Sequence, residues 1–278
     1  MPTQQEKAQQ LLKLHDKGGN LLLPNAWDSA SARLFEEAGF PAIATTSSGV
    51  AFANGYGDGQ QISRDEMLAI IKRIVAAVNI PVTADVEAGY GPTPEDVATT
   101  VRGVIEAGAV GINLEDNTGY GNPLFSIDDQ VKRIAAGREA ADQAGIALVI
   151  NARTDTYLFQ IGAAETRMQD TLDRAKAYLE AGASSIFVPG VLDQATIEKL
   201  VQGIPGPLNV LVGPGAPSAP ELFGWGVRRI SVGGSVMQAT MGLVRAIATE
   251  LRQSGTYEQI GQYALTHSQA QQLMTQKQ

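Results

Sequence analysis

The sequence contains no cysteine among its 278 residues, which excludes disulfides, thiolate nucleophiles and cysteine metal sites. Only two histidines occur, His15 and His267, and both fall in segments expected to lie outside the barrel core predicted below. A histidine base or a histidine-ligated metal is therefore not expected. No lysine lies on any predicted strand, and this disfavours a Schiff-base mechanism, because that chemistry needs a buried lysine at such a place.

Positive charge and long apolar runs are also scarce. Lysine and arginine number 21 against 29 acidic residues, a net charge of −8, which argues against nonspecific binding to nucleic acid or anionic membranes. No apolar run is long enough to cross a bilayer, and residues 1–10 show no apolar signal region. We therefore expect a cytoplasmic protein without nucleic-acid or membrane partners. Its 44% hydrophobic content suits a globular chain with a sizeable core.

What the sequence does contain is a regular alternation of β-rich runs with amphipathic helical patterns. The predicted strands cover 21–27, 42–47, 82–87, 111–116, 148–154, 185–190, 208–213 and 229–234. The predicted helices cover 29–38, 64–78, 94–107, 127–144, 164–181, 193–202, 217–224 and 235–253. Helix signals support the pattern. Ser63 with Glu66 forms a capping-box pattern, Thr93-Pro94 is typical of a helix start, and Ala38-Gly39 and Ala107-Gly108 are typical of helix ends.

Strand–helix alternation gives a parallel sheet with right-handed crossovers. Eight such units in about 250 residues match a closed (β/α)8 TIM barrel of the α/β class. A doubly wound open sheet is the alternative, weakened because no G-x-G-x-x-G follows the first strand. No linker is evident, so residues 1–278 are predicted to form one domain. The barrel occupies about 20–253, and the tail, about 256–278, is predicted to add a helix that packs on a neighbouring subunit or on its own barrel.

The run from Val82 to Gly91 carries the strongest chemical signal. Asp85 and Glu87 lie two residues apart on a predicted strand and so point to one side. Two carboxylates so placed repel each other unless a positive charge lies between them, and Mg²⁺ prefers such oxygen ligands. The alternative is a solvated strand end with two surface acids.

Other polar residues gather at the ends of neighbouring strands, where barrel enzymes carry their chemistry. Ser47, Ser48 and Gly49 follow the second strand and offer hydroxyl and N–H donors to an oxyanion or carboxylate, or form an ordinary turn. Asp58 lies between two glycines in the next loop, a setting more often typical of a turn residue. Gly213-Pro214-Gly215 and Gly233-Gly234-Ser235 follow the last two strands. Without a nearby lysine they indicate turns and helix starts rather than a phosphate site.

The fourth and fifth strands add a possible substrate clamp. Glu115 shares its strand with Asn113, and Asn151, Arg153 and Asp155 fall on one side of the next strand. An arginine at a strand end can grip a carboxylate with two parallel hydrogen bonds. It can equally form an ion pair with Glu115 or Asp155, and both roles are compatible. Acids, one arginine and hydroxyls suit an enolate-forming reaction, in which Mg²⁺ stabilises charge developing on oxygen.

Five motifs together resemble the isocitrate lyase/phosphoenolpyruvate mutase superfamily. They are Pro24-Asn25-Ala26-Trp27-Asp28, Ser47-Ser48-Gly49-Val50, the run from Asp85 to Gly91, Leu114-Glu115-Asp116 and Asn151-Ala152-Arg153-Thr154. The resemblance covers about residues 20–250. It implies a tetrameric (β/α)8 barrel, a dimer of dimers whose last helices are exchanged between paired subunits.

The resemblance also implies roles for individual residues. Mg²⁺ or Mn²⁺ is expected at Asp85, with Asp58, Glu87 and Glu115 reaching the ion mainly through water. A substrate carboxylate is expected near Ser48 and Gly49, with Arg153 close to the reacting oxyanion.

The chain departs from that superfamily in the loop after the fourth strand. The lyases carry a cysteine motif there, and the mutase and phosphonopyruvate hydrolase carry a lysine and an asparagine. This chain has residues 117–123 (NTGYGNP) instead, without lysine or cysteine. Tyr120 is the obvious proton carrier in the loop, although it can also be a loop aromatic that packs over the cavity mouth.

These observations predict a Mg²⁺-dependent lyase or hydrolase acting on a C–C bond of a small 2-oxo or hydroxy dicarboxylate. Arg153, Glu115 and Tyr120 are the predicted catalytic residues. The predicted substrate-binding residues are Ser47, Ser48, Gly49, Asp58, Asn151 and Arg153, and the predicted metal ligands are Asp85, Glu87 and Glu115. The alternatives are P–C chemistry on phosphonopyruvate and a 2-oxo-acid binding protein without catalysis.

Overall fold

The computed structural model describes residues 2–15, 19–119 and 123–275. Its strands are β1 (Leu21–Leu23), β2 (Asn25–Ala26), β3 (Ile43–Thr45), β4 (Val82–Asp85), β5 (Gly111–Glu115), β6 (Val149–Arg153), β7 (Ser185–Phe187), β8 (Leu208–Leu211) and β9 (Arg229–Ser231). Its helices are α1 (Gln4–Leu14), α2 (Ser29–Glu37), α3 (Ser47–Ala53), α4 (Arg64–Ala77), α5 (Pro94–Glu106), α6 (Ile127–Gln143), α7 (Ala164–Glu180), α8 (Gln194–Gly203), α9 (Ala219–Gly224), α10 (Ser235–Gln253), α11 (Glu258–Tyr263) and α12 (His267–Thr275).

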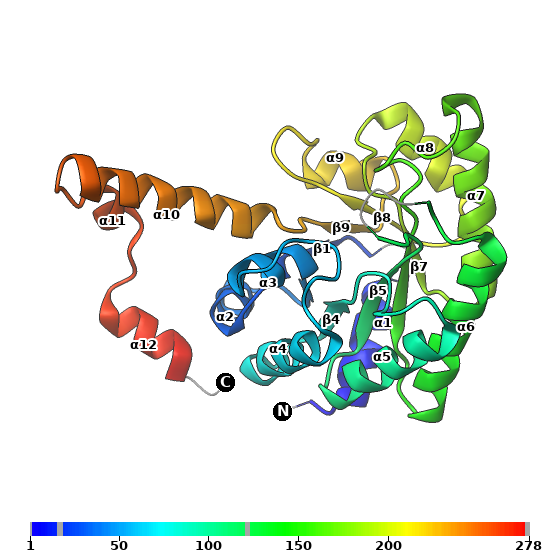
Figure 1. The fold of residues 1–278 in the computed structure, drawn as a ribbon, viewed down its shortest axis with the longest axis horizontal. Helices are drawn as coiled ribbons and strands as arrows, with labels where there is room; N and C mark the ends of the chain where they lie inside the picture. Colours follow the sequence, from blue (N-terminus) through cyan, green and yellow to red (C-terminus); the bar gives the residue numbers. More distant parts are fainter. Residues whose placement is uncertain (1, 16–18, 120–122, 276–278) are drawn as a thin grey trace.

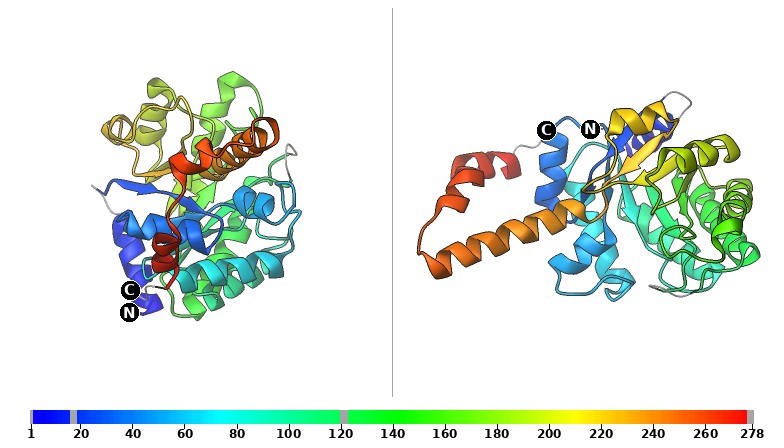
Figure 2. Two further views of the ribbon diagram at one scale, coloured as in Figure 1. Left: turned by 90° about the vertical axis from the view of Figure 1, so that its left-hand side faces the viewer. Right: turned by 90° about the horizontal axis from the view of Figure 1, so that it is seen from above.

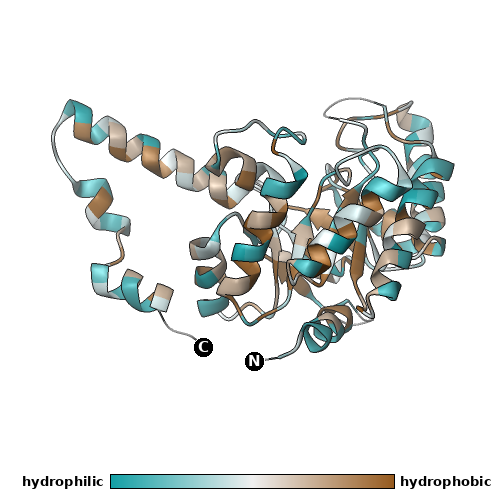
Figure 3. Ribbon diagram, turned by 60° about the horizontal axis from the view of Figure 1, so that its bottom comes forward, coloured by the Kyte–Doolittle hydropathy of each residue, from teal (hydrophilic) through white to brown (hydrophobic). Residues whose placement is uncertain are grey.

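The nine strands form one parallel sheet in the order β1-β9-β8-β7-β6-β5-β4-β3-β2. Because β1 and β2 are consecutive parts of one run, the two ends of this order meet, and the sheet curls into a nearly closed barrel with helices outside it (Figure 1). The predicted α/β TIM-barrel class is confirmed. Figure 3 shows the apolar strands inside and the hydrophilic helix faces outside, as expected for buried parallel strands.

The first predicted strand, 21–27, is broken in the structure. Pro24 has no N–H and so cannot donate to a neighbouring strand, but its carbonyl accepts from the Ala44 N–H at 2.9 Å. The chain therefore pairs with β9 before Pro24 and with β3 after it. The other predicted strands match observed strands within three residues, and the predicted helices match α2 and α4 to α10 within two.

Local capping signals account for the accuracy of these helix boundaries. Ser63 and Glu66 form the predicted capping box at the start of α4, and Thr93 forms one with Asp96 at α5. Gly39 and Gly108, with φ of 87° and 90°, follow α2 and α5 in the left-handed conformation, as helix C-termini require.

Helix α1 was not predicted, although Thr3 and Glu6 form a capping box that marks its start. Its Ala8 and Leu11 are fully buried against Leu21, Leu23, Ala42, Ala44, Val110 and Val149. These residues lie in the first part of the strands or just before them. Helix α1 therefore closes the N-terminal end of the barrel. The opposite end, where the strands finish, remains available for chemistry.

His15, at the end of α1, corrects the expectation that both histidines lie outside the core. Its side chain is only 4% exposed. Nδ1 lies 2.8 Å from the Leu11 carbonyl oxygen, and Nε2 lies 3.3 Å from Nη1 of Arg229, another buried side chain. Since the guanidinium only donates, Nε2 accepts and the ring is neutral. Burial and the neighbouring Arg229 charge lower the pKa of His15 to about 4, against the opposing effect of the Leu11 hydrogen bond.

The C-terminal segment, α10 to α12, forms an arm: α10 leads away from the barrel, and after α11 the chain turns back so that α12 contacts α2 (Figures 1 and 2). None of these helices contains a buried residue. The predicted single tail helix is replaced by two short ones, α11 and α12. Within the described residues, no helix combines the length and apolar character that a membrane span needs.

Because His15 is buried and neutral, we expect it to make the free energy of unfolding depend on pH. Because the pKa is about 4 in the folded chain and about 6.5 when unfolded, the unfolded state binds more protons between these values. The free energy of unfolding should then fall as the pH drops through this window, by about 1.4 kcal/mol per pH unit at most from this residue. His15→Gln should lack this component in urea denaturation at pH 4.5 to 7.

His267→Gln is the matched control, because His267 is exposed on α12. Its pH profile should run parallel to that of the unaltered protein. A parallel profile for His15→Gln as well would show that His15 is not held neutral in the folded chain.

Candidate active site

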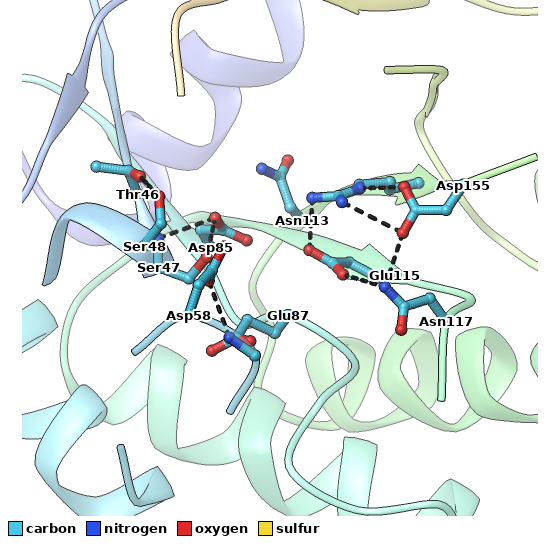
Figure 4. A network of polar contacts seen from close by, with 12 residues as sticks. Thr46, Ser47, Ser48, Asp58, Asp85, Glu87, Asn113, Glu115, Asn117 and Asp155 are labelled. Carbon is cyan, nitrogen blue, oxygen red and sulfur yellow. Dashed lines mark hydrogen bonds and ion pairs between the residues drawn. The ribbon is translucent and has the colours of Figure 1, made fainter. Parts of the chain in front are cut away.

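A cavity of about 290 Å³ lies where the strands end, among the loops that follow them. Polar side chains make up much of its wall. They include Asn25, Ser47, Ser48, Asp58, Gln60, Asp85, Glu87, Asn113, Glu115, Asn117, Arg153 and Gln238. In Figure 4, Asp58, Asp85 and Glu87 lie on one side, Glu115, Asn117 and Asp155 on the other, and Asn113 between them.

Asp85 is held from one side only. Its Oδ2 accepts the backbone N–H and the hydroxyl of Ser47 at 3.0 and 2.8 Å, and its own N–H donates to the Thr45 hydroxyl at 2.8 Å. Its Oδ1 is buried and has no hydrogen-bond partner in the described structure. A buried carboxylate oxygen without a donor is unfavourable, so this atom is suited to contact a cation.

Glu87 reaches the cavity by a turn rather than by the strand period. The predicted strand 82–87 ends at Asp85, and Glu87 has a left-handed φ of 50°. Its carboxylate accepts the Gln60 N–H at 2.6 Å, and Gln60 is left-handed as well, with φ of 57°. Two non-glycine residues in this sparsely populated region store strain, a feature common at functional sites.

The acids on this side repel one another. Burial raises the pKa of Glu87 to about 8, and the charges of Asp85 and Asp58 add to the effect. Burial and the Asp85 charge likewise raise the pKa of Asp58. The Gly59 N–H, which bonds Asp58 at 3.0 Å, only partly offsets this. A cation between these groups would relieve the repulsion.

Arg153 organises the other side of the cavity. Its Nε and Nη2 donate to the two oxygens of Asp155 at 2.6 and 3.2 Å, and Nη1 donates to Glu115 at 2.6 Å. Asn117 donates to both Asp155 and Glu115, at 2.9 and 3.3 Å. Both ion pairs considered from the sequence are therefore present. Three of the five guanidinium N–H groups are used, and Arg153 still lines the cavity.

Charge on this side is incompletely balanced. Burial raises the pKa of Glu115 well above its usual value, against the opposing effect of Arg153, and the charge of Asp155 raises it further. Burial lowers the pKa of Arg153, but the carboxylates of Glu115 and Asp155 raise it more. The guanidinium is therefore permanently charged, and its planar fork is fixed by its two partners.

Of the remaining predicted site residues, some line the cavity and others do not. Ser47 and Ser48 line the cavity at the start of α3, a short helix that the sequence did not predict. Gly49 lies behind them, where its N–H bonds the Thr46 hydroxyl at 3.2 Å. Asn151 is fully buried below the cavity and does not line it. Tyr120 lies outside the described residues. Gly233 and Gly234 precede α10, so the predicted helix start is confirmed.

Several cavity residues were not assigned from the sequence. Gln60 fixes Glu87 as described, and its Oε1 accepts the Tyr90 N–H at 2.8 Å. Asn25 accepts the N–H groups of Val232 and Gly233 at 3.0 and 2.9 Å and so ties β2 to the loop before α10. Asn117 was noted only as part of a loop. The signal available for Asn25 was its place at a strand end, whereas nothing in the pattern marked Gln60.

The donor set fits a hard divalent cation, because all candidate ligands are oxygens. Among the described residues, no three acidic or histidine side chains are placed to ligate one ion together. Among the acidic side chains of the cavity, Asp85 is the one with a buried carboxylate oxygen, Oδ1, that has no hydrogen-bond partner in the described structure. Glu87 and Glu115 line the same cavity, where they can contribute charge without direct contact.

A parallel barrel with a cavity of polar side chains at its strand ends has the arrangement in which α/β-barrel enzymes carry their active sites. Comparison with known proteins makes this specific. Residues 11–252 match the family described as phosphoenolpyruvate phosphomutase. The chain belongs to this family, within the isocitrate lyase/phosphoenolpyruvate mutase superfamily, so the resemblance seen in the sequence is confirmed.

Individual relatives agree with this assignment. An uncharacterized protein of Mycobacterium tuberculosis is 36% identical over 220 residues, 79% of this chain and 80% of the relative. The 2-methylisocitrate lyase of Bacillus subtilis is 29% identical over 213 residues, 74% and 67% of the two chains. A Burkholderia cenocepacia structure, provisionally described as a lyase/mutase, is similar at 38% identity, with a TM-score of 0.91 and coverage of 99% and 97%.

A fourth similarity concerns ligands. Phosphonopyruvate hydrolase, solved with oxalate and Mg²⁺, is 25% identical, with a TM-score of 0.82 and coverage of 96% of this chain and 94% of that one. The metal and the oxalate belong to that protein's structure.

The prediction for this site concerns metal binding by Asp85. Asp85→Asn keeps the shape of the side chain but removes its charge, so Mg²⁺ binding in calorimetry should be abolished. Mg²⁺ should raise the melting temperature of the unaltered protein and not of the variant. Without metal, the variant should melt at or above the unaltered protein, because one of several repelling charges is gone.

Asp170→Asn is the control, since Asp170 lies on α7 beside Arg174, away from the cavity. It should bind Mg²⁺ normally. Unchanged Mg²⁺ affinity in Asp85→Asn would refute the assignment of this carboxylate.

Proposed function

We propose that the protein is a Mg²⁺-dependent lyase or hydrolase that acts on a C–C bond of a small 2-oxo or hydroxy dicarboxylate through an enolate. The observation that carries this proposal is the pairing of two features across one cavity. One is the unpartnered buried oxygen of Asp85, and the other is an immobilised guanidinium with unused N–H groups. An oxyanion placed between a cation and such a donor is stabilised without reorganisation.

Relatives support the reaction type. The Bacillus subtilis relative is a 2-methylisocitrate lyase, and phosphonopyruvate hydrolase has been solved with oxalate and Mg²⁺. Mg²⁺, or Mn²⁺ in its place, would be held by Asp85, with Asp58, Glu87 and Glu115 around it. When bound, the metal acts as a Lewis acid that stabilises negative charge developing on a substrate oxygen.

The chain's own residues bind and orient the substrate. Ser47 holds Asp85 in position, and the exposed part of Ser48 offers a hydroxyl and an N–H to a substrate carboxylate. Arg153 donates to the substrate oxygen that gains negative charge when the bond breaks. Glu115 and Asp155 accept from the guanidinium and so fix the orientation of its plane. Leu158, Phe187 and Leu211 form apolar parts of the wall, which limit water around the reacting atoms.

The cavity favours carboxylates over phosphonates. Arg153 is the single cationic side chain among the described lining residues, and two carboxylates offset its charge. A phosphonate dianion would add more negative charge than this surface balances. P–C chemistry on phosphonopyruvate therefore ranks second, and a 2-oxo-acid binding protein without catalysis ranks third.

The lyase substrates themselves are disfavoured. Isocitrate and 2-methylisocitrate cleavage requires proton delivery to the leaving carbanion, and the superfamily's lyases use a loop cysteine for it, whose thiol can be tuned toward neutral pH. This chain has no cysteine. A smaller 2-oxo acid such as oxaloacetate fits the proposal better.

A substrate panel with Mg²⁺ at neutral pH tests this function. Oxaloacetate or a similar 2-oxo acid should be turned over faster than isocitrate, 2-methylisocitrate or phosphonopyruvate. Arg153→Lys should lower kcat/KM roughly 10²-fold, because lysine keeps the charge but loses the planar fork. Faster turnover of phosphonopyruvate would select P–C chemistry, and tight binding without any turnover would select the binding protein. Near-normal kinetics of Arg153→Lys would restrict Arg153 to a structural ion pair.

We also propose that the active form is a homo-oligomer, a dimer of dimers in which the arm formed by α10 to α12 packs on another subunit. The arm exposes large apolar side chains, among them Val244 at 59%, Tyr257 at 68% and Tyr263 at 59%. A single-subunit arm would leave this apolar surface in water. The arm begins at the cavity wall, where Ser235 and Gln238 line the cavity.

Light scattering after gel filtration tests this assembly. The unaltered protein should exceed the 29.3 kDa mass of one chain, and Val244→Asp combined with Tyr263→Asp should shift it toward that mass. Gln253→Asp adds a charge to α10 without removing an apolar group, and it should leave the mass unchanged. A monomeric unaltered protein would contradict the assembly.

A further inference from the structure

Arg229 is a buried cation without a carboxylate partner. It lies on β9, it is 0% exposed, and no ion pair includes it among the described residues. Its Nε has no hydrogen-bond partner in the described structure. Burying such a group costs several kcal/mol unless other contacts compensate, so its two remaining contacts are informative.

One contact connects Arg229 to the floor of the cavity. Its Nη2 donates to Oδ1 of Asn113 at 3.1 Å, while Nη1 donates to His15 at the closed end of the barrel. Burial lowers the pKa of Arg229 to about 9, against an opposing effect of the Asp85 charge. The guanidinium is therefore protonated at neutral pH and can only donate.

A second donor meets the same oxygen of Asn113. Nδ2 of Asn151 donates to Oδ1 at 2.7 Å, and Asn151 is itself fixed by the Ser185 hydroxyl, which donates to its Oδ1 at 2.6 Å. The carbonyl oxygen of Asn113 has two lone pairs, and both are used. Asn151, predicted to bind substrate, thus supports a residue that lines the cavity.

These contacts determine which way the Asn113 amide faces. The two ends of an asparagine amide are often ambiguous, but a flipped amide here would place its NH₂ against a guanidinium that cannot accept. Oδ1 must therefore face Arg229 and Asn151. The NH₂ group then faces the cavity, where Asn113 lines the wall between Asp85 and Glu115 (Figure 4), and it makes no hydrogen bond to another described residue.

We propose that Arg229 is a positioning residue, which orients the Asn113 amide so that its NH₂ donates to a substrate oxygen. This inference rests on the proposed function, because it needs a small oxygen-rich anion in the cavity. Asn113 then supplies a neutral donor between the metal side and the arginine side of the site. The amide stabilises a substrate oxygen without adding a further charge to a cavity whose carboxylates already repel one another.

The arrangement explains why a costly buried arginine is present. A neutral hydroxyl or amide group beneath Asn113 could also donate to Oδ1. Such a group can accept a hydrogen bond as well, however, and would therefore permit the Asn113 amide to flip. Only a side chain that donates and never accepts enforces one orientation. Lysine and arginine are the two such cations, and the planar guanidinium spans Asn113 and His15 together.

Binding of oxalate in the presence of saturating Mg²⁺, measured by calorimetry, tests the inference without relying on turnover. Asn113→Ala should weaken oxalate binding about 10- to 100-fold, the loss of a hydrogen bond to a charged group. Arg229→Met should weaken it about 10-fold or more. In the Asn113→Ala background, Arg229→Met should have little further effect, because the second residue acts through the first.

Asn113→Asp separates orientation from folding. Aspartate accepts from both Asn151 and Arg229, and its pairing with the Arg229 charge offsets the repulsion from Asp85 and Glu115, so the variant should remain folded, as circular dichroism would check. The atom that faces the cavity, however, becomes an anionic acceptor, and oxalate affinity should fall more than about 100-fold. Asn209→Asp is the matched control. Asn209 is buried beside Arg229 on β8 but does not line the cavity, so this variant should bind oxalate nearly normally.

The outcomes separate the two proposals. If the unaltered protein does not bind oxalate with Mg²⁺, the proposed function fails, and this inference fails with it. If it binds oxalate but Arg229→Met binds equally well, only the inference fails. Unchanged oxalate affinity in Asn113→Asp would also overturn it, as would equal losses of oxalate affinity from Arg229→Met in both backgrounds.

Discussion

Repulsion among buried carboxylates is the constraint on which the site depends. Asp58, Asp85 and Glu87 share one side of a small cavity, and Glu115 lines the other with Arg153, which also pairs with the buried Asp155. The chain reduces this repulsion with neutral donors, such as the Ser47 hydroxyl and the Gln60 N–H, but it does not remove it. A site of this kind suits a cation and an oxyanion, since a cation bound among these carboxylates would lower their mutual repulsion.

The scaffold tolerates that stored energy because its stability lies elsewhere. Helix α1 and the apolar residues at the starts of the strands pack together and close the N-terminal end of the barrel, with Leu11 and Val110 among them. Asp116, just behind the site, is paired with Arg174 and Tyr178 at 3.2 and 2.8 Å, and it links β5 to α7. The barrel thus separates a well-packed end from an electrostatically strained one, as expected where activity and stability compete.

Most of the fold and half of the site could be predicted from the sequence, because these features arise from local rules. Capping at Ser63 and Thr93 and the strand–helix alternation depend on neighbours a few residues apart. The strand ends located Asp85, Glu115 and Arg153. What was missed depends on contacts far apart in the sequence. His15 and Arg229 meet across 214 residues. Glu87 reaches the cavity through its own left-handed backbone conformation, and the N–H of the distant Gln60 holds its carboxylate there, which no periodicity indicates.

Helix α10 belongs to both the site and the arm, and its length has a mechanical consequence. Ser235 and Gln238 in its first turn line the cavity, while the rest of its 19 residues project from the barrel. At 1.5 Å per residue the helix is a rod about 28 Å long, and Gln238 lies only about 5 Å from its start. Measured from Gly234, the far end of the helix is about five times as distant as Gln238. In a rotation about Gly234, a displacement of about 2 Å at the far end would therefore move Gln238 by about 0.4 Å, so the cavity wall is displaced about fivefold less than the end of the arm.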